Sequence, residues 1–525
     1  MKYKVFIPSA GIGSRLGPHT KLRNKALITL GDLPVIVRII KKFPQDVEFV
    51  IALGYRGTQI QQAVEALCPN YKIEFVNISK FEGEGASLGL TIAECKQYLQ
   101  TPFIFIPNDT IVDIDPDSLS PIRMGNWAGY YKKTLGDQVP TEQYRTLDIY
   151  DGKVTQFNAK GLNSDNIYIG LAGIRDYNAF WKFFEMATDI SAGEVVALDL
   201  LSNICAIEFK TWEDIGNLKS LQKATKKFRN YAYNILEKEN EAIWFEKDQV
   251  TKFHVDSLFI SDRVKRLDIL PKGLFPKLTS FSDNTYSYDR VEGDIFSSIV
   301  SPHLVRKLLE TMQKYLWKNT CPDSSDNKSI TYEFYKAKSF SRVEYFFSRF
   351  ERLDKPLQIN DVKIPAARNL LKKVPWNNII KRAKFAEFHG DFHSENIIFR
   401  KDKTFCLLDW RQNFGANNYQ YGDVYYDLSK FLHGLIVNHK EAECQNFIIS
   451  KKDDNSIYID IKMRYNNYKS IKELKAWCEE YDYSFKNVEL LTGLIYLNIC
   501  GLHEYPYAEF LFYLGMLMVF ENIDE

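Results

Sequence analysis

Short apolar runs that alternate with helical patterns through the first 217 residues constrain the fold of this chain most strongly. The runs cover residues 5–7, 49–53, 73–76 and 103–106. Runs of this length between helical segments are typical of βαβ units, so we expect an α/β fold with a mostly parallel sheet. Ligands of such sheets bind beyond the carboxyl ends of the strands, where functional residues are therefore expected.

A chain of 525 residues is too long for one hydrophobic core and suits two or three domains. Residues 218–239 are charged and helical in pattern, without Gly or Pro, which predicts a closing helix that becomes a connector. We expect a first domain over residues 1–235 and a second over 236–525. The second should be α+β, with a hairpin near its start and a strand pair at 396–399 and 405–408 within helices.

Composition limits the partners. Lys plus Arg number 68 against 67 Asp plus Glu, so no overall field attracts nucleic acid or an anionic membrane, and small molecules are the expected partners. The eight cysteines lack zinc or Cys-x-x-Cys spacing and indicate free thiols in a reducing cytoplasm. The start lacks signal-peptide features and no apolar run has the length of a membrane span, so we expect a cytoplasmic protein without membrane insertion. A homo-oligomer stays open.

A glycine-rich segment follows the first apolar run and suggests phosphate binding. In Gly11-Ile12-Gly13-Ser14-Arg15, the glycines let backbone N–H groups approach an anion closely. Arg15 and Lys25 could neutralise a triphosphate and the charge on departing pyrophosphate. Leu16 excludes the dinucleotide-binding fingerprint, and the absence of Gly-Lys-Ser/Thr excludes a Walker A loop. Taken alone, the glycines fit a tight strand-to-helix turn equally well.

Two carboxylates complete this first pattern. Asp109 ends an apolar strand, where it would face the ligand crevice, although an N-cap is the alternative. Asp214 lies in Trp-Glu-Asp-Ile-Gly, where a turn is the alternative. The order Gly-x-Gly-x-Arg, Lys25, Asp109 and Asp214 resembles the sugar-phosphate nucleotidylyltransferase superfamily, which includes phosphocholine cytidylyltransferases, over about residues 1–217.

This resemblance implies a Rossmann-like nucleotidylyltransferase domain with assigned site residues. Arg15 and Lys25 would be catalytic through the triphosphate, and Asp109 and Asp214 would hold Mg²⁺. Lys160 is similar to the lysine that reaches the acceptor phosphate, although the usual Glu-Lys-Pro has become Ala-Lys-Gly and a solvated lysine is the alternative. The implied nucleotide-binding residues are Ala10, Gly11, Gly13, Glu84, Gly85 and Ala86. Asn24 replaces the proline usual before the lysine.

A second, more specific pattern lies downstream, in His389-Gly390-Asp391 with Asn396 and then Asp409 after an apolar strand. Phosphoryl transfer needs one group to orient the attacking hydroxyl and two oxygen ligands for Mg²⁺. Asp391 fits the first role, and Asn396 and Asp409 fit the second. The pattern resembles the aminoglycoside phosphotransferase and choline kinase superfamily over about residues 241–525, which implies a kinase-like fold. His389 is expected to brace the loop.

Two further residues follow from the second resemblance. Lys252 fits the strand lysine that grips the α and β phosphates of ATP, although an outward-facing strand lysine is the alternative. Its acidic partner stays open among three aspartates. They are Asp256, Asp262 and Asp268. Asp427 is similar to the family's structural acid near the catalytic loop.

Two phosphate-handling sites on one chain suggest consecutive reactions. A kinase would phosphorylate a small alcohol with ATP, and the phosphate would attack a second nucleotide, with CTP favoured by resemblance. The product would be an activated donor for capsule or lipopolysaccharide synthesis. Arg411 follows Asp409-Trp410, where choline kinases present Glu, and a cation there favours a sugar or polyol over choline or ethanolamine. A cage of Tyr419, Tyr421, Tyr425 and Tyr426 could instead hold an ammonium group, although packing is the favoured role of these tyrosines. A non-catalytic kinase-like domain is the alternative of another class.

Overall fold

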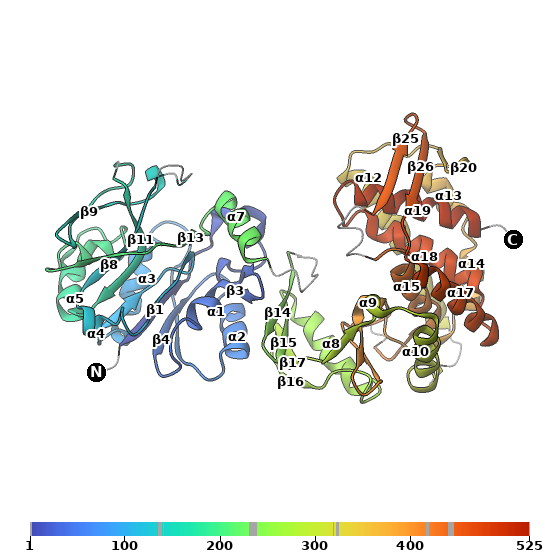
Figure 1. Ribbon diagram of the computed structural model, residues 1–525, viewed down its shortest axis with the longest axis horizontal. Coiled ribbons are helices and arrows are strands. Elements are labelled where there is room, and N and C mark those ends of the chain that lie inside the picture. The colour runs from blue at the N-terminus through green and yellow to red at the C-terminus, as the bar shows by residue number, and fades with distance from the viewer. Residues whose placement is uncertain are drawn as a thin grey trace. The chain divides into compact units, whose positions relative to one another are not determined.

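The computed structural model describes residues 3–134, 139, 141–162, 164–229, 239–318, 320–321, 325–415, 419–438 and 446–523. The chain forms two compact units (Figure 1). The first unit comprises Met1–Ile260 and Leu278–Tyr288, and the second comprises Ser261–Lys277 and Asp289–Glu525. The predicted boundary at 235/236 falls within 230–238, outside the described residues, and stays a prediction.

A nine-stranded sheet organises the first unit, in the order β5-β4-β1-β6-β11-β8-β12-β10-β9. Strands β5, β4, β1 and β6 are parallel, and the strands beyond β6 pair antiparallel, except that β12 runs parallel to β8. Each predicted strand is present, and the predicted α/β fold is confirmed. The strand bounds are β1 Lys4–Ser9, β4 Glu48–Leu53, β5 Lys72–Asn77, β6 Phe103–Phe105, β8 Trp127–Lys132, β9 Leu147–Tyr150, β10 Lys153–Phe157, β11 Asn166–Ile174 and β12 Cys205–Glu208.

Helices cover both faces of this sheet, which explains why its central strands are apolar throughout. On β1, Val5 and Ile7 join one hydrophobic core, whereas Phe6 joins the core on the opposite face. The first core includes residues of α1 (Val35–Ile40), α2 (Gly57–Leu67) and α7 (Leu218–Phe228). The second includes residues of α3 (Leu88–Glu94), α5 (Tyr177–Met186) and α6 (Val195–Leu198). Helix α7 is the start of the predicted closing helix; it ends at Phe228, and residues 230–238 of that prediction lie outside the described residues.

Two short strands outside the main sheet position the acidic residues. Strand β7 (Thr110–Val112) begins directly after Asp109, and strand β13 (Trp212–Asp214) ends at Asp214. They pair antiparallel, with Thr110 opposite Asp214. The two predicted metal ligands are therefore brought to the same end of one ladder.

A separate four-stranded sheet also belongs to the first unit, in the order β14-β15-β17-β16. Its strands are β14 Glu241–Glu246, β15 Gln249–His254, β16 Leu278–Phe281 and β17 Thr285–Asp289. The predicted hairpin is thus present as β14 and β15. The indole of Trp244 donates to Thr29 Oγ1 at 3.0 Å, and Phe245 N–H donates to the Asp32 carbonyl at 2.9 Å. The hairpin therefore packs against β2 (Thr29–Leu30) and β3 (Leu33–Pro34).

The second unit is mainly helical, as expected (Figure 1). Its helices are α8 Ser257–Ile269, which begins in the first unit, α9 Phe296–Ile299, α10 Pro302–Tyr315, α11 Ser325–Tyr332, α12 Lys338–Arg349, α13 Ala367–Lys373, α14 Trp376–Arg382, α15 Val424–Ile436, α17 Tyr465–Glu480, α18 Phe485–Cys500 and α19 Tyr507–Asn522. Helix α18 packs against α12, α15 and α19. Within the described ranges, no helix is both long and apolar enough to cross a bilayer.

Short strands flank residues 389–396, the predicted catalytic loop of this unit. Its strands are β18 Gly293–Ile295, β19 Leu357–Ile359, β20 Val362–Ile364, β21 Phe385–Glu387, β22 Ile397–Arg400, β23 Phe405–Leu407, β24 Tyr421–Asp423, β25 Phe447–Lys451 and β26 Ser456–Ile461. Strands β22 and β23 are the predicted pair and run antiparallel. Strand β21 enters the catalytic loop and the β22–β23 hairpin leaves it, so the predicted α+β kinase-like arrangement holds.

Candidate active sites

Hydrogen bonds of the Asn24 side chain fix the conformation of the loop after β1. The Asn24 amide donates to the carbonyls of Ser9 at 3.1 Å and Tyr55 at 2.7 Å, and its oxygen accepts from Ala26 N–H at 2.9 Å. A proline could make none of these side-chain contacts, so asparagine ties the loop after β1 to the loop after β4. A Cβ at Gly11 would meet no atom within 4 Å. This leaves the backbone there accessible to an anion.

Four predicted residues of the first unit come together. Lys25 Nζ lies 2.8 Å from Asp109 Oδ2. The side chains of Arg15, Asp109 and Asp214 surround Gly216. A Cβ added to this glycine would lie 3.0 Å from Asp214 Oδ1 and 3.4 Å from both the Arg15 guanidinium and Asp109 Oδ2. The β7–β13 ladder creates this convergence across more than a hundred residues of sequence. The arrangement sets two cations against two carboxylates, as triphosphate chemistry with a divalent cation requires.

The two carboxylates differ in their electrostatics. Burial alone would raise the pKa of Asp109, but the charge of Lys25, with its hydrogen bond and the charge of Arg15, holds that pKa below its usual value. Burial raises the pKa of Asp214 despite the hydrogen bond that Tyr144 donates, 2.6 Å long, and Asp109 adds repulsion. A divalent cation between them would oppose the raised pKa of Asp214 and the repulsion between the two carboxylates, because it attracts each of them in its charged form.

The remaining predicted residues of the first unit are less constrained. Glu84, Gly85 and Ala86 lie in the loop before α3, with Gly85 at φ 85°. Gly54 packs against both the Ala10 carbonyl and Phe81, so this loop begins beside the loop after β1. Lys160 is exposed two residues after Asn158, which is anchored to Thr146. No contact among the described residues joins Lys160 to the carboxylates, so its role stays a prediction.

In the second unit, hydrogen bonds to Asp427 and His389 fix the backbone of residues 389–396, the predicted catalytic loop. Asp427 on α15 accepts from the backbone N–H groups of His389 and Gly390, both at 2.7 Å. The buried His389 ring accepts from Asp391 N–H through Nδ1 at 3.1 Å and contacts the Leu408 carbonyl through Nε2 at 2.9 Å. Burial lowers the pKa of His389 to about 4, so the ring is neutral near pH 7. Both residues therefore have the geometry expected of bracing groups.

Asp391 and Asn396 lie together at the centre of this loop. Asn396 Nδ2 donates to the Asp391 carbonyl at 3.0 Å and to Asp391 Oδ2 at 3.3 Å, which orients its amide. Lys430 Nζ on α15 lies 2.7 Å from Asp391 Oδ1. Burial alone would raise the pKa of Asp391, but Lys430 and His393 hold it well below its usual value. A carboxylate with so low a pKa suits orienting a hydroxyl better than removing its proton early.

Asp409 has a strained backbone and an unexpected partner. Its φ is 56°, in the left-handed region that few residues other than glycine adopt, although Asp does so more readily than most. Arg263 on α8 forms an ion pair with Asp409. The neighbouring buried Arg266 donates to the carbonyls of Phe388, His389 and Arg411. Helix α8 therefore ties the catalytic loop to the segment that carries Asp409.

Lys252 lies on β15 in the first unit, whereas Asp391, Asn396 and Asp409 lie in the second. Among its candidate partners, Asp256 accepts from Leu258 N–H at 3.0 Å near the start of α8, Asp262 interacts with Tyr419, and Asp268 is exposed. The partner of Lys252 stays open.

The tyrosines proposed as an ammonium cage do not share one pocket wall. Tyr425 is buried and its hydroxyl accepts from Ser484 N–H at 2.9 Å. Tyr426 is buried against Phe334, with ring centroids 4.9 Å apart. Both are packing residues, which was the favoured alternative.

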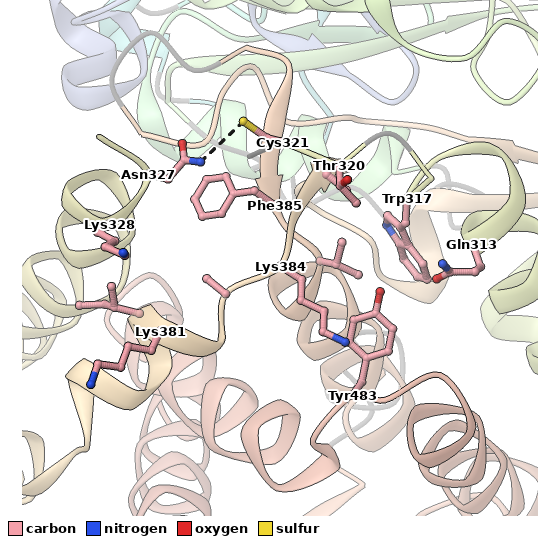
Figure 2. Close-up of a pocket in the computed structure, with 14 residues that line it drawn as sticks. Gln313, Trp317, Thr320, Cys321, Asn327, Lys328, Lys381, Lys384, Phe385 and Tyr483 are labelled. Carbon is pink, nitrogen blue, oxygen red and sulfur yellow. Dashed lines mark hydrogen bonds between the residues drawn. The ribbon is translucent and has the colours of Figure 1, made fainter. Parts of the chain in front are cut away.

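A cavity of about 330 Å³ lies in the second unit away from these residues (Figure 2). Its lining includes Trp317, whose indole donates to Asp427 at 3.1 Å, and Lys384, which lies over the Tyr483 ring. Asn327 donates to Cys321 Sγ at 3.6 Å on the opposite side (Figure 2). The described lining contains none of the predicted catalytic or metal-binding residues, so the cavity is separate from the candidate site.

Both sites offer ligands that suit Mg²⁺. Mg²⁺ is commonly bound by one or two protein carboxylates together with substrate phosphates. Asp109 and Asp214 converge in the first unit, and Asn396 and Asp409 supply an amide oxygen and a carboxylate in the second. The residues present therefore fit the ion in each unit.

Sequence reasoning missed three contributors: Lys430, Arg263 and Tyr144. Lys430 left a local signal, since it follows Asp427 by three residues and so shares its face of α15. Arg263 and Tyr144 left none, because their partners lie 146 and 70 residues away.

Comparison with known proteins identifies relatives of each part. Residues 308–450 match the model of APH, the phosphotransferase enzyme family. The N-terminal part is similar to bifunctional protein GlmU of Methanococcus maripaludis, 25% identical over 234 residues, which are 42% of this chain and 53% of that protein. It is also similar to glucose-1-phosphate cytidylyltransferase of Salmonella typhi, 23% identical over 179 residues, which are 30% of this chain and 68% of that protein. The chain spans about half the length of the GlmU relatives.

Solved structures also align with about two fifths of this chain, at low similarity. The CTP:phosphocholine cytidylyltransferase LicC of Streptococcus pneumoniae aligns with a TM-score of 0.36 and 17% identity, covering 44% of this chain and 100% of that one. HddC of Yersinia pseudotuberculosis aligns with a TM-score of 0.34 and 22% identity, covering 43% and 100%. With the family match, the curated relatives confirm the predicted fusion of a nucleotidylyltransferase-like domain with a phosphotransferase-like domain.

Proposed function

We propose that this chain is a bifunctional enzyme that builds a nucleotide-activated donor in two steps. The second domain, from about residue 236, phosphorylates a small alcohol, a sugar or polyol, with ATP. The first domain joins the resulting phosphate to CTP and releases pyrophosphate. The observation that carries the proposal is that predicted phosphate-handling residues come together twice, around Gly216 in the first unit and around Asp391 in the second, although Lys252 belongs to the first unit.

In the kinase step, Asp391 orients the acceptor hydroxyl toward the γ-phosphorus of ATP. The new O–P bond forms as the bond from the γ-phosphorus to the β–γ bridging oxygen breaks, ADP leaves, and the hydroxyl proton passes to Asp391. Asn396 and Asp409 would hold Mg²⁺, which supplies charge neutralisation on the phosphates. Lys252 would grip the α and β phosphates.

In the transfer step, an oxygen of the new phosphate attacks the α-phosphorus of CTP. The α–β bridging bond breaks and pyrophosphate leaves, with its charge neutralised by Arg15 and Lys25. Asp109 and Asp214 would hold Mg²⁺, and Lys160 would bind the acceptor phosphate. The loop with Ala10, Gly11, Gly13, Glu84, Gly85 and Ala86 would bind the nucleotide. Similarity to a glucose-1-phosphate cytidylyltransferase supports CTP.

We place the reaction in the cytoplasm, where ATP and CTP are available, and its product in surface polysaccharide synthesis. Choline or ethanolamine kinase coupled to cytidylyl transfer is the second candidate, supported by the resemblance to choline kinases. Arg411, which lies over the Phe334 ring near Asp391, counts against it because it would repel a quaternary ammonium.

Paired single substitutions test whether the two sites work separately. Asp391→Asn should reduce ADP formation by roughly 10²–10⁴-fold because the hydroxyl loses its orienting carboxylate. Pyrophosphate release from CTP and a supplied sugar phosphate should be unchanged. Lys25→Ala should give the reverse pattern. Mass spectrometry of products from ATP, CTP and pools of sugars, polyols and amino alcohols measures both steps. Unchanged ADP formation by Asp391→Asn would support a non-catalytic second domain instead.

A further inference from the structure

Four basic side chains act on one another near Asp391, and we call them the cationic cluster: Lys338, Arg342, Arg411 and Lys430. Lys338 is within the electrostatic reach of the other three and of Asp391, and Lys430 pairs with Asp391 directly. Lys338 Nζ lies 4.5 Å from the centroid of the Phe334 ring, and the Arg411 guanidinium carbon lies 5.0 Å from the same centroid. Two basic side chains therefore lie against one aromatic ring. Lys430 joins them to Asp391 through its ion pair.

The cluster lacks balancing negative charge. Within the described ranges, Lys430 pairs with Asp391, but no ion pair joins Lys338, Arg342 or Arg411 to a carboxylate. Burial lowers the pKa of Lys338 well below its usual value, and the charges of Arg411, Lys430 and Arg342 lower it further. Among the strongest influences, only the charge of Asp391 raises this pKa. Like charges held together are unfavourable, so an anion between them would be bound strongly.

The backbone also departs from regular geometry at this place. Residues Glu333–Ala337 form a π-helical turn between α11 and α12, and Lys338 follows directly. Such turns often occur at functional sites, because they redirect side chains from their ordinary helical positions. Here the turn carries Phe334 and is followed by Lys338, the two residues that meet Arg411.

We propose that the acceptor alcohol of the second domain carries an anionic group, a carboxylate or a phosphate, bound by Lys338, Arg342 and Arg411. This inference rests on the proposed kinase function of the same site. The anionic group would hold the acceptor so that its hydroxyl reaches Asp391, where it attacks the γ-phosphorus and releases ADP and a proton. An anion there would favour the charged form of Lys338, whereas a quaternary ammonium acceptor would be repelled by Arg411 and Arg342.

The first experiment measures binding directly in the full chain, with Mg²⁺ and a non-hydrolysable ATP analogue occupying the ATP site. D-Glycerate, inorganic phosphate and choline are titrated by calorimetry into wild type and into a Lys338→Met, Arg342→Met double variant. Each anion should bind wild type at least about tenfold more tightly than the double variant, since two charge-assisted contacts are lost. Choline should not bind. Comparing the affinities for D-glycerate and for inorganic phosphate shows whether the cluster prefers a carboxylate or a phosphate.

Control variants keep the result interpretable. Lys336→Met removes a neighbouring lysine that lies over Tyr332 instead, and should bind anions as wild type does. Lys338→Arg keeps the charge and should retain most of the affinity even if the double variant folds poorly. Equal anion binding by wild type and the double variant, binding of choline, or no anion binding at all would each overturn the inference.

A second measurement separates this inference from the proposed function. ADP formation is followed with glycerol, glycerate and glycerol phosphate, and with glucose, glucuronate and glucose 6-phosphate. A higher kcat/KM for the anionic acceptors of each series, together with an acceptor KM raised about tenfold or more in the double variant, would support both the kinase function and the anionic acceptor. If only neutral acceptors were phosphorylated, the inference of an anionic acceptor would be wrong, whereas the proposed kinase function would stand. A raised KM for ATP alone would assign the cluster to the γ-phosphate and overturn the inference.

Discussion

Single buried ionisable residues set much of the pH dependence of this protein. Glu194, at the N-terminus of α6, is 5% exposed and accepts a 3.0 Å hydrogen bond from the hydroxyl of the equally buried Tyr168. Burial raises the pKa of Glu194 to about 7. Its carboxyl is therefore largely protonated in the folded protein at pH 6, whereas it is ionised in an unfolded chain.

The raised pKa of Glu194 predicts that stability falls as pH rises. The folded state binds one more proton than the unfolded state between about pH 4.5 and 7, so the free energy of unfolding decreases across that window. The full loss is about 3 kcal/mol, at 1.36 kcal/mol per pKa unit. Glu194→Gln should remove this loss, and denaturant unfolding at pH 5 and pH 8 measures it. A variant with the same pH slope as wild type would show that Glu194 titrates normally.

At the scale of elements, the β7–β13 ladder explains how a glycine completes the first site. Pairing of Thr110 with Asp214 places Gly216 between the two carboxylates and Arg15. Because no side chain fills that position, the space is open to a metal ion and phosphate oxygens. The glycine is therefore required by space, not by backbone conformation.

Gly216→Ala should consequently impair the first reaction only. The added Cβ would lie 3.0 Å from Asp214 Oδ1 and 3.4 Å from Asp109 Oδ2, which displaces the predicted metal ligands. The carboxylates need to move by only a few tenths of an ångström, so we expect pyrophosphate release to fall by about tenfold, less than the roughly hundredfold cost of a full ångström. ADP formation serves as the internal control for folding. If pyrophosphate release were normal at limiting Mg²⁺, the two carboxylates would not form the metal site.

Sequence patterns anticipated the elements better than the contacts between them. The apolar runs identified β1, β4, β5 and β6, because strands buried on both faces leave continuous hydrophobic segments. The same local patterns placed Asp109 and Asp391 at strand ends and loops. Partners such as Tyr144 for Asp214 could not be predicted, because they depend on how distant elements pack.

At the scale of the whole molecule, motif boundaries and compact units differ. The hairpin β14–β15 bears Lys252, which the kinase resemblance includes, yet it packs in the first unit. Trp244 and Phe253 are fully buried in the same hydrophobic core as residues of α1 and α2. The strand that would grip ATP phosphates is therefore anchored to the nucleotidylyltransferase-like part of the chain.

This anchoring predicts that cutting the chain at the motif boundary damages the first unit. A fragment of residues 1–235 would expose the surface that Trp244 and Phe253 cover, and each lost buried aromatic costs about 3–5 kcal/mol. We expect this fragment to melt at lower temperature than a matched fragment of residues 1–290, which retains the hairpin and β16–β17.

Calorimetry and pyrophosphate release measure the difference between these fragments. Trp244→Ala in the full chain provides an independent control, because it removes one side chain from the shared core without cutting the backbone. It should lower the melting temperature of the first unit, as removal of the hairpin in the fragment of residues 1–235 does. If residues 1–235 were as stable and active as residues 1–290, the hairpin would belong energetically to the kinase-like part, and the motif boundary would also be the folding boundary.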